Sequence, residues 1–300
     1  AVCRPLFFFS ERRETMETIG IIAGFGELPS LCAQGAAASG HTVALFDLVP
    51  SQLFLLPQAQ QEEILLERKA LKAVVDSYWE VGLGDFSRII GLAHKLQIQQ
   101  MVSVGKVRKD ALFHNQKLDQ RLMELLASLP LHNDDAIQKA VVGELEREGI
   151  LVLSQLHFLR SSVPGPGVLT EHVPTPELWQ DLDYGYKLAK AVAGLDIGQT
   201  VVVKQRAVLA VEALEGTDRT IRRGAELGGE GTVVVKVSKP QQDPRFDIPV
   251  IGPDTLKTVI DVRAKVLAFD ANLTLLMHKE ELIAQAQNAG ICLVAMEGVK

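Results

Sequence analysis

The sequence predicts an α/β protein, with an N-terminal Rossmann-like open parallel sheet followed by a second α/β domain. Short apolar runs typical of buried strands alternate with helical segments along most of the 300 residues. The first run, IGIIA at 19–23, leads into a glycine-containing turn and then a helix. The segment VPGPG at 163–167 interrupts the pattern once, because two prolines and two glycines continue neither a helix nor a strand. Alternation of this kind favours mostly parallel sheets.

Each element of the N-terminal half is predicted from its local pattern. Residues 19–23 suit a buried parallel strand, and Pro29 suits the first turn of the helix that follows. A helix at 134–148 would be capped by Asn133. The other predicted elements are strands at 42–46, 101–107 and 150–153 and helices at 86–96 and 117–128.

The C-terminal half repeats this alternation after the proline-glycine break. Residues 201–211 alternate as in a hairpin that turns near Gln205 and Arg206. The remaining elements are helices at 177–193, 218–227, 254–264 and 279–287 and strands at 233–237, 266–269 and 291–295. We therefore predict a tag or disordered extension at 1–15, a Rossmann-like domain at 16–162, a hinge or linker at 163–168 and a C-terminal catalytic domain at 169–300.

The composition excludes several classes of protein. Apolar residues make up 47% and charged residues 23% of the chain, and the net charge of -6 argues against a nucleic-acid binder. Cys3, Cys32 and Cys292 form no CxxC pair, which indicates a reducing compartment and no structural zinc. No apolar run reaches the roughly 20 residues that span a bilayer, and LFFF at 6–9 is too short for a signal sequence. We expect a cytoplasmic protein.

The turn after the first strand resembles the start of a dinucleotide-binding loop. Gly24 and Gly26 would let a phosphate approach the backbone, and Asp47 follows at the distance expected of a ribose-binding acid. Pro29 stands where the fingerprint has its third glycine. A tight strand-to-helix turn explains the glycines equally well. One alternative function is therefore an oxidoreductase that uses a nicotinamide cofactor.

Two smaller clusters have ordinary explanations beside functional ones. Lys106, Arg108 and Lys109 follow a strand, where they suit a phosphate or headgroup contact or a solvated loop. Asn133 and the acids at 134–135 open a helix, and helix capping explains them best.

The most informative segment is 211–254, in which two β-prone runs each lead into a charged loop. The first loop contains Glu215, Thr217 and Asp218, with Arg219, Arg222 and Arg223 one turn later. Thr217 or Asp218 would suffice to cap the next helix, but the number of charges exceeds what capping requires.

The second charged loop carries the strongest signal. Three prolines at 240–249 stiffen a stretch that presents Asp243, Arg245 and Asp247, as a preorganised site requires. A surface loop with one internal salt bridge is the alternative. Carboxylates can hold a divalent cation, while Lys236, Lys239 and Arg245 can hold phosphate. The loop therefore predicts a metal-assisted phosphate site. The sequence contains no HExxH, GxSxG or P-loop motif.

Several blocks together resemble one family. They are IGIIAGFGELP, GKVRK, NDDAI, GPGVLT, LDIGQTVVV, AVLAVEALEGTDRTIRR, VVVKVSKPQQDPRFDIPVIGPDT and GICLVAME. In this order they resemble the LpxI-type UDP-2,3-diacylglucosamine pyrophosphatases of lipid A biosynthesis, over residues 17–297. The EGTD block and the proline-rich block are the most specific of them. Phe25 stands where the family often has a further glycine, and Lys109 stands where it often has a proline.

The resemblance implies an activity and its requirements. Such enzymes hydrolyse the pyrophosphate of a UDP-linked diacylated glucosamine by attack of water on the α-phosphorus, which releases UMP and 2,3-diacylglucosamine 1-phosphate. They require a divalent cation, Mg²⁺ or Mn²⁺, and bind the lipid between two domains. They are homodimers of soluble or membrane-peripheral character, which places this chain in the cytoplasm, at the inner membrane when it collects its lipid.

The resemblance also places the family's catalytic, metal-binding aspartate on Asp247, within the R-x-D-x-P motif. We expect Asp218 and Asp243 to assist as metal ligands, and Asp218, Lys239 and Arg245 to act with Asp247 in catalysis. The expected substrate-binding residues are Gly24, Gly26, Lys106, Glu215, Thr217, Lys236 and Gln241. A third hypothesis is a nucleotide or lipid sensor that binds the same ligand without turnover.

Overall fold

The computed structural model describes residues 17–108, 118–130 and 134–297. The chain divides into two compact units, the first ending at Leu153 and the second beginning at Ser154. The predicted extension at 1–15, Lys109 and the predicted cap Asn133 lie outside the described residues.

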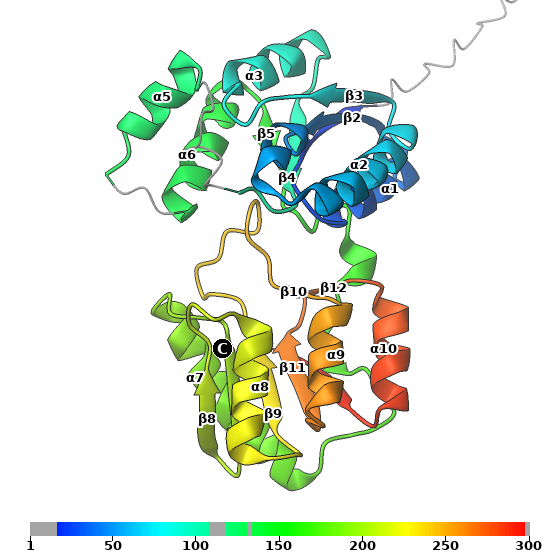
Figure 1. Cartoon of the computed structure of the whole chain (residues 1–300), viewed down its shortest axis with the longest axis vertical. Helices are drawn as coiled ribbons and strands as arrows, with labels where there is room; N and C mark the ends of the chain where they lie inside the picture. The colour runs from blue at the N-terminus through cyan, green and yellow to red at the C-terminus, as the bar shows by residue number, and fades with distance from the viewer. Residues whose placement is uncertain (1–16, 109–117, 131–133, 298–300) are drawn as a thin grey trace, which may run out of the picture. The chain divides into compact units, whose positions relative to one another are not determined.

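The first unit contains one parallel sheet of five strands in the order β3-β2-β1-β4-β5 (Figure 1). Its strands are β1 (Thr18–Ala23), β2 (Thr42–Asp47), β3 (Ser77–Glu80), β4 (Gln100–Val104) and β5 (Leu151–Val152). Its helices are α1 (Leu28–Ala38), the 3-10 turn η1 (Pro50–Leu55), α2 (Gln58–Ala73), α3 (Phe86–Lys95), α5 (Gln120–Ala127) and α6 (Asp134–Arg147).

This sheet confirms the predicted Rossmann-like architecture. The chain moves outward from β1 to β2 and β3, then returns to the other side of β1 with β4 and β5. The strand order therefore reverses at the β1–β4 pair, which is where open α/β sheets usually bind ligands. The central strands are apolar and buried on both faces, as parallel pairing requires, with Ile19, Ile21, Val43, Leu45 and Met101 fully inaccessible.

Two elements of this unit have weak sequence signals. Strand β3 reads SYWE and is only half-buried, because it lies at an edge of the sheet. Helix α2 carries mostly polar side chains and buries only Arg68 and Leu71. Strand β4 ends at Val104, earlier than predicted, because Gly105 turns the chain with a φ of 91°.

The second unit contains a six-stranded sheet in the order β6-β13-β11-β9-β7-β8. Strands β9 (Val233–Lys236), β11 (Val266–Asp270) and β13 (Cys292–Met296) are parallel, and β6 (Gly167–Val168), β7 (Thr200–Lys204) and β8 (Ala207–Val211) pair antiparallel with their neighbours. A separate short pair joins β10 (Val250–Ile251) and β12 (Leu275–Leu276). The helices are η2 (Arg160–Ser162), α7 (Pro176–Gly194), α8 (Thr217–Gly228), α9 (Pro253–Asp261) and α10 (Lys279–Asn288).

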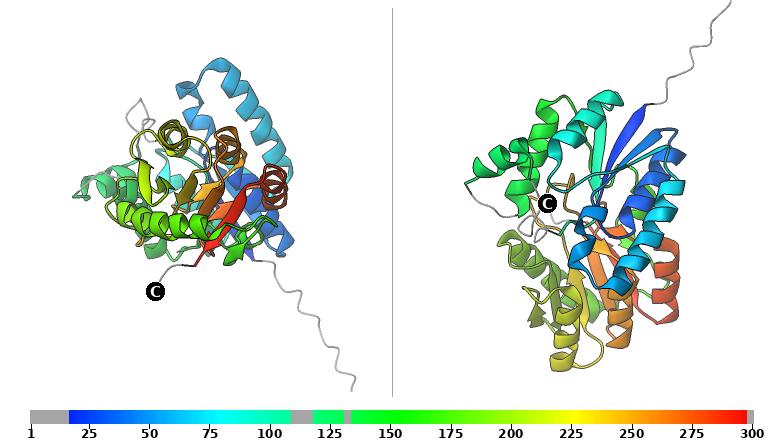
Figure 2. Two further views of the ribbon diagram at one scale, coloured as in Figure 1. Left: turned by 90° about the horizontal axis from the view of Figure 1, so that it is seen from below. Right: turned by 45° about the horizontal axis from the view of Figure 1, so that its top comes forward.

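The sheet of the second unit is a layer between helices. Alternate residues of its strands point to opposite faces, so that Val201 and Val235 pack with α7 while Val202 and Val234 pack with α8 and α9. Figure 2 shows α7 on one side of this sheet and α8, α9 and α10 on the other. The inner strands are thus buried on both faces, and the polar loops lie at the ends of the strands.

The hairpin predicted at 201–211 is confirmed. Gln205 and Arg206 form its turn, both with positive φ, and the buried carboxylate of Asp181 accepts their backbone N–H groups at 2.8 and 2.6 Å. The predicted linker at 163–168 stays a prediction. In this segment Pro164 O accepts a hydrogen bond from Asn272 N, and Gly167 pairs with β13.

Candidate functional site

Both charged loops of segment 211–254 lie at one edge of the second sheet. Strands β9 and β11 end there at Lys236 and Asp270. Strand β7 starts at the same edge, because Thr200 pairs with Lys236, and β8 ends there, because Val211 pairs with Val201. This edge therefore gathers the segments 195–199, 212–217, 237–249 and 271–274, which are far apart in the sequence.

The first charged loop, 212–217, is held by its own acids. The Glu212 carboxylate accepts hydrogen bonds from Thr217 Oγ1 at 3.0 Å and from Gln199 N at 3.3 Å. Glu215 forms an ion pair with Arg223 at 2.5 Å. The pKa of Glu215 is lowered by its own backbone N–H and then by the Arg223 guanidinium. Glu215 is therefore a carboxylate at neutral pH, and its charge is already paired within the loop.

Helix α8 begins directly after this loop. Gly216 precedes it with a φ of 84°, a conformation that side chains disfavour. Asp218 lies in the first turn, where its Oδ1 accepts a hydrogen bond from Thr255 Oγ1 of α9 at 3.1 Å. Asp218 thus joins two helix N-termini on one face of the sheet.

The second charged loop closes on itself through Asp243. Both carboxylate oxygens of Asp243 accept hydrogen bonds from the Arg245 guanidinium, at 2.9, 3.1 and 2.7 Å. The backbone oxygen of Asp243 accepts from Phe246 N and Asp247 N. The internal salt bridge weighed for this loop is therefore present. Asp247 is half-buried, and Gln241 is exposed.

The two predicted phosphate-binding lysines have structural partners as well. Lys239 Nζ forms an ion pair with Asp196 Oδ1 at 2.5 Å, and Lys239 N donates to Gln242 Oε1 at 2.8 Å. Lys236 Nζ donates to Val250 O at 3.0 Å, which joins the end of β9 to β10. The loop therefore starts and ends at fixed points.

A buried polar cluster at the same edge was missed from the sequence. Asp270 is 2% exposed and accepts hydrogen bonds from Tyr186 OH, from Lys190 Nζ at 2.7 Å and from both Ser238 N and Ser238 Oγ at 2.6 Å. Burial, and then the hydrogen bond to Asp270, raises the pKa of Tyr186. The available signal was an acid directly after the apolar run 266–269.

In the first unit, Gly24 allows two chain segments to pack closely, and Gly26 allows the turn beside it. Gly24 N donates to Val104 O, and Phe25 forms an isolated antiparallel bridge with Lys106. A Cβ on Gly24 would lie 2.8 Å from the carbonyl carbons of Gly105 and Lys106, whereas at Gly26 the positive φ is the constraint. Close packing and backbone conformation thus explain these two glycines without a bound phosphate. The side chain of Lys106 is exposed.

Asp47 is fully buried at the end of β2. Its carboxylate accepts hydrogen bonds from Val49 N at 3.0 Å and from Tyr78 OH, and it lies 3.9 Å from Arg68 Nη1. Burial raises the pKa of Asp47. Arg68 Nη2 in turn donates to Gly24 O at 2.9 Å. The structure gives Asp47 an internal role in place of the ribose contact considered from the sequence.

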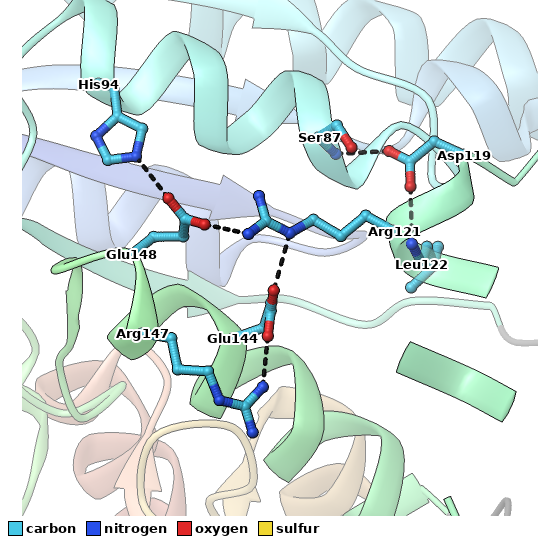
Figure 3. A network of polar contacts seen from close by, with 8 residues as sticks. All are labelled: Ser87, His94, Asp119, Arg121, Leu122, Glu144, Arg147 and Glu148. Atoms are coloured by element: carbon cyan, nitrogen blue, oxygen red, sulfur yellow. Dashed lines mark hydrogen bonds and ion pairs between the residues drawn. The ribbon is translucent and has the colours of Figure 1, made fainter. Parts of the chain in front are cut away.

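A further polar network of the first unit lies on its surface (Figure 3). Arg121 of α5 pairs with Glu144 at 2.8 Å and with Glu148, which also contacts His94 at 3.0 Å. Arg147 pairs with Glu144. His94 and Glu148 line a cavity of about 800 Å³ beside the start of β1 and the residues before β4. This is the amino-terminal edge of the sheet, so the network joins α3, α5 and α6 away from the edge where α/β proteins carry their chemistry.

Comparison with known proteins identifies the family. A model described as the LpxI N-terminal domain matches residues 18–162, and one described as the LpxI C-terminal domain matches residues 165–294. The chain belongs to the LpxI family. The UDP-2,3-diacylglucosamine pyrophosphatase LpxI of Caulobacter vibrioides is 29% identical to it over 295 residues, which cover 94% of this chain and 98% of that protein. The family suggested by the sequence blocks is thereby confirmed.

Solved structures give weaker likenesses to this LpxI-family chain. AtPrR2 in its apo form is 9% identical, with a TM-score of 0.29, over 94% of this chain and 80% of that one. The biotin carboxylase domain of a thermophilic 2-oxoglutarate carboxylase is 11% identical, with a TM-score of 0.25, over 61% of this chain. The chain spans only 34% of that carboxylase. Scores at this level carry no conclusion.

The described residues bring no three acidic, histidine or cysteine side chains into a group that could hold a metal ion. Asp243 is engaged with Arg245, and Asp218 with Thr255. Magnesium is nevertheless often bound by one or two protein carboxylates together with substrate phosphates and water. A cation at the second charged loop would have to be bound in that mode, with the substrate supplying several of the ligands.

Membrane-spanning helices were sought among the same described residues. None of the helices found there combines the length and the apolar character needed to cross a bilayer.

Proposed function

We propose that this protein hydrolyses the pyrophosphate bond of UDP-2,3-diacylglucosamine, giving UMP and 2,3-diacylglucosamine 1-phosphate in lipid A biosynthesis. The observation that carries the proposal is the match of the two LpxI domain models along residues 18–162 and 165–294. The name of the Caulobacter vibrioides relative supplies the substrate and the reaction. A gathering of carboxylates and cations at one sheet edge supports the same chemistry.

The residues of the second charged loop would have separate roles in this reaction. Asp247 would hold a divalent cation, Mg²⁺ or Mn²⁺, which when bound neutralises charge on the diphosphate. Lys239 and Arg245 would bind phosphate oxygens, and the bidentate contact of Asp243 would orient the Arg245 guanidinium toward them. Asp218 and Asp243 as additional metal ligands remain predictions, as do the substrate contacts of Glu215, Thr217, Lys236 and Gln241. The contacts of Gly24, Gly26 and Lys106 with substrate, in the first unit, are also predictions.

A lipid substrate also requires apolar contacts near the reacting diphosphate. Leu195, Ile197 and Leu214 are 72%, 50% and 103% exposed, and all three lie in segments at the edge that carries the charged loops. Gly198 packs against Glu212, so the segments that carry Ile197 and Leu214 are neighbours. We propose that this rim contacts the acyl chains or the membrane face, and that the protein is a cytoplasmic, membrane-peripheral homodimer.

Hydrolysis in ¹⁸O-labelled water tests the reaction directly. Purified protein is mixed with UDP-2,3-diacylglucosamine in detergent micelles and Mg²⁺, and the products are analysed by mass spectrometry. Attack on the α-phosphorus puts the label into UMP and leaves the lipid phosphate unlabelled. Substrate that is bound but never cleaved would instead support the sensor alternative.

Two further measurements test the cofactor and the partners. A chelator is expected to abolish UMP release, and Mg²⁺ or Mn²⁺ to restore it; full activity in excess chelator would refute the metal requirement.

The membrane contact and the oligomeric state need separate measurements. The fraction of protein that sediments with anionic lipid vesicles should fall when Leu195, Ile197 and Leu214 are replaced by serine. Analytical ultracentrifugation is expected to give the mass of a dimer. Retention of nicotinamide cofactor by the purified protein would revive the oxidoreductase alternative.

A further inference from the structure

The buried carboxylate of Asp270 connects three segments that are remote in sequence. It belongs to the last residue of β11. Its donors are Tyr186 and Lys190 of α7 and Ser238, two residues after the end of β9. Oδ2 alone accepts three of these hydrogen bonds. A buried carboxylate is costly unless it is hydrogen-bonded and paired with a cation, so such a set of donors is needed to keep it there.

The position of Ser238 gives this cluster its significance. Ser238 immediately precedes Lys239, the first residue of the second charged loop. Its neighbours are fixed from the opposite side, because Val237 N donates to Gln199 O at 2.9 Å and Lys239 Nζ pairs with Asp196. Three consecutive residues are thus held alternately by the segment before β7 and by the end of β11. The charged loop therefore starts from a fixed backbone.

The far end of the loop is fixed as well. Pro249 O accepts a hydrogen bond from Leu275 N, and Val250 pairs with Leu275 in the short β10–β12 sheet. The chain reaches β12 from Asp270 within five residues, and Thr274 N donates to Asp270 O at 3.1 Å. The Asp270 side chain therefore contacts Ser238 at the start of the charged loop. Its backbone oxygen binds Thr274 N, next to Leu275, which holds the end of the loop.

We propose that Asp270 is a positioning residue for the second charged loop: its carboxylate fixes Ser238 and thereby sets the placement of Lys239 and Asp247. The expected effect on kcat rests on the proposed function, whereas the expected effect on the loop's structure does not. The carboxylate is buried and acts only through the backbone of the loop. Tyr186 and Lys190 hold it in one orientation.

The chain offers a matched control in Asp181. Asp181 is 6% exposed and lies on α7, the helix that also carries Tyr186 and Lys190. It accepts two backbone N–H groups of a turn, as Asp270 accepts that of Ser238. Its turn, 205–206, is at the opposite edge of the same sheet from the charged loops. Asp270→Asn and Asp181→Asn therefore disturb similar buried hydrogen bonds at the two edges.

The experiment compares these two variants with the wild-type full chain by hydrogen exchange and by UMP release. Asp270→Asn is expected to speed amide exchange in residues 238–247 and to lower kcat at least tenfold, with a smaller change in KM. Asp181→Asn should speed exchange only around residues 205–206 and keep the wild-type kcat. Ser238→Ala, which removes only one donor, should change exchange and kcat in the same direction as Asp270→Asn and by less.

Several outcomes would overturn the inference. One is wild-type exchange of residues 238–247 in Asp270→Asn, whatever its activity. Another is an equal loss of kcat in Asp181→Asn, since both effects would then follow from general destabilisation. If Asp270→Asn does not fold, Ser238→Ala decides by the same two measurements. Absence of UMP release by the wild type would refute the proposed function. The exchange data would still test whether Asp270 fixes residues 238–247.

Discussion

Asp47 and Asp270 make an instructive pair, because each is a buried acid at the end of a parallel strand, hydrogen-bonded to a tyrosine hydroxyl and close to a cation. Asp47 bonds to Val49, two residues further along its own chain. Asp270 bonds to Ser238, which follows a neighbouring strand. The first arrangement completes a local turn, whereas the second fixes a loop that carries charges. The same residue types therefore have different consequences, according to which segment the carboxylate reaches.

The two sheet edges differ in the same way. At the carboxyl edge of the first unit, the glycine turn packs on the backbone of Gly105 and Lys106. At the corresponding edge of the second unit, Glu215, Lys239 and Arg245 keep charged groups partly in contact with solvent while their backbones are tied down. At the second edge, several charged groups that are partly accessible stand on a fixed backbone, which is what electrostatic catalysis needs.

The largest effect is expected at the second edge. Asp247→Ala should lower the rate of UMP release by about 10²- to 10³-fold, the usual loss when one preorganised electrostatic group is removed. Circular dichroism and Tm should stay close to wild type. Asp254→Ala, which removes an exposed acid from the first turn of α9, is the control and should keep full activity. Full activity in Asp247→Ala would contradict a catalytic site at the second edge.

Glycine replacement tests whether the first edge is made for packing. Gly24→Ala places a Cβ against the backbone of Gly105 and Lys106, and should cost about 1–3 kcal/mol of unfolding free energy. Gly26→Ala, where the space is open, should cost about 1–2 kcal/mol through its positive φ alone. Urea unfolding measures both. A higher KM for substrate with unchanged stability in Gly24→Ala would instead indicate a ligand contact.

Titration of Asp47 gives a smaller effect with a defined sign. Burial raises its folded-state pKa above the unfolded value, so its contribution to stability is complete below the unfolded pKa and is lost as pH rises through the folded pKa. Asp47→Asn loses hydrogen-bond acceptance and should cost about 1–3 kcal/mol in acid. That cost should shrink toward neutral pH. Urea unfolding at about pH 4 and about pH 8 tests this, and a cost that grows with pH would contradict it.

The smallest effect is expected in the surface network of Figure 3. Arg121 is one-third exposed, and exposed ion pairs contribute little. Arg121→Ala should lower Tm by about 1–3 °C and leave UMP release unchanged. The difference should largely vanish at about 1 M salt, where the Debye length is about 3 Å. A large loss of activity in this variant would assign a role to the amino-terminal edge of the first sheet.

The sequence alone determined most of the elements of both units. Apolar runs such as 19–23 and 233–237 predicted strands because parallel strands covered on both faces must be apolar throughout. The turn at Gln205 and Arg206 followed from the alternation on either side of it. Strand β3 and helix α2 were missed, because an edge strand and an exposed helix bury too few side chains to leave a clear period. The specific blocks at 215–218 and 239–252 were enough to indicate the family.

Only the tertiary structure decided which polar groups are neighbours. The sequence places Ser238 32 residues from Asp270 and 48 from Lys190, and the three meet because β9 and β11 are adjacent and α7 covers them. Likewise, Gly24 and Asp47 match a nucleotide-binding pattern in sequence. In the structure, Gly24 packs against the backbone of residues 105–106, and Asp47 accepts a hydrogen bond from the Tyr78 hydroxyl. Local patterns report which side a residue must face. The partners it meets there depend on strand order, which no local pattern encodes.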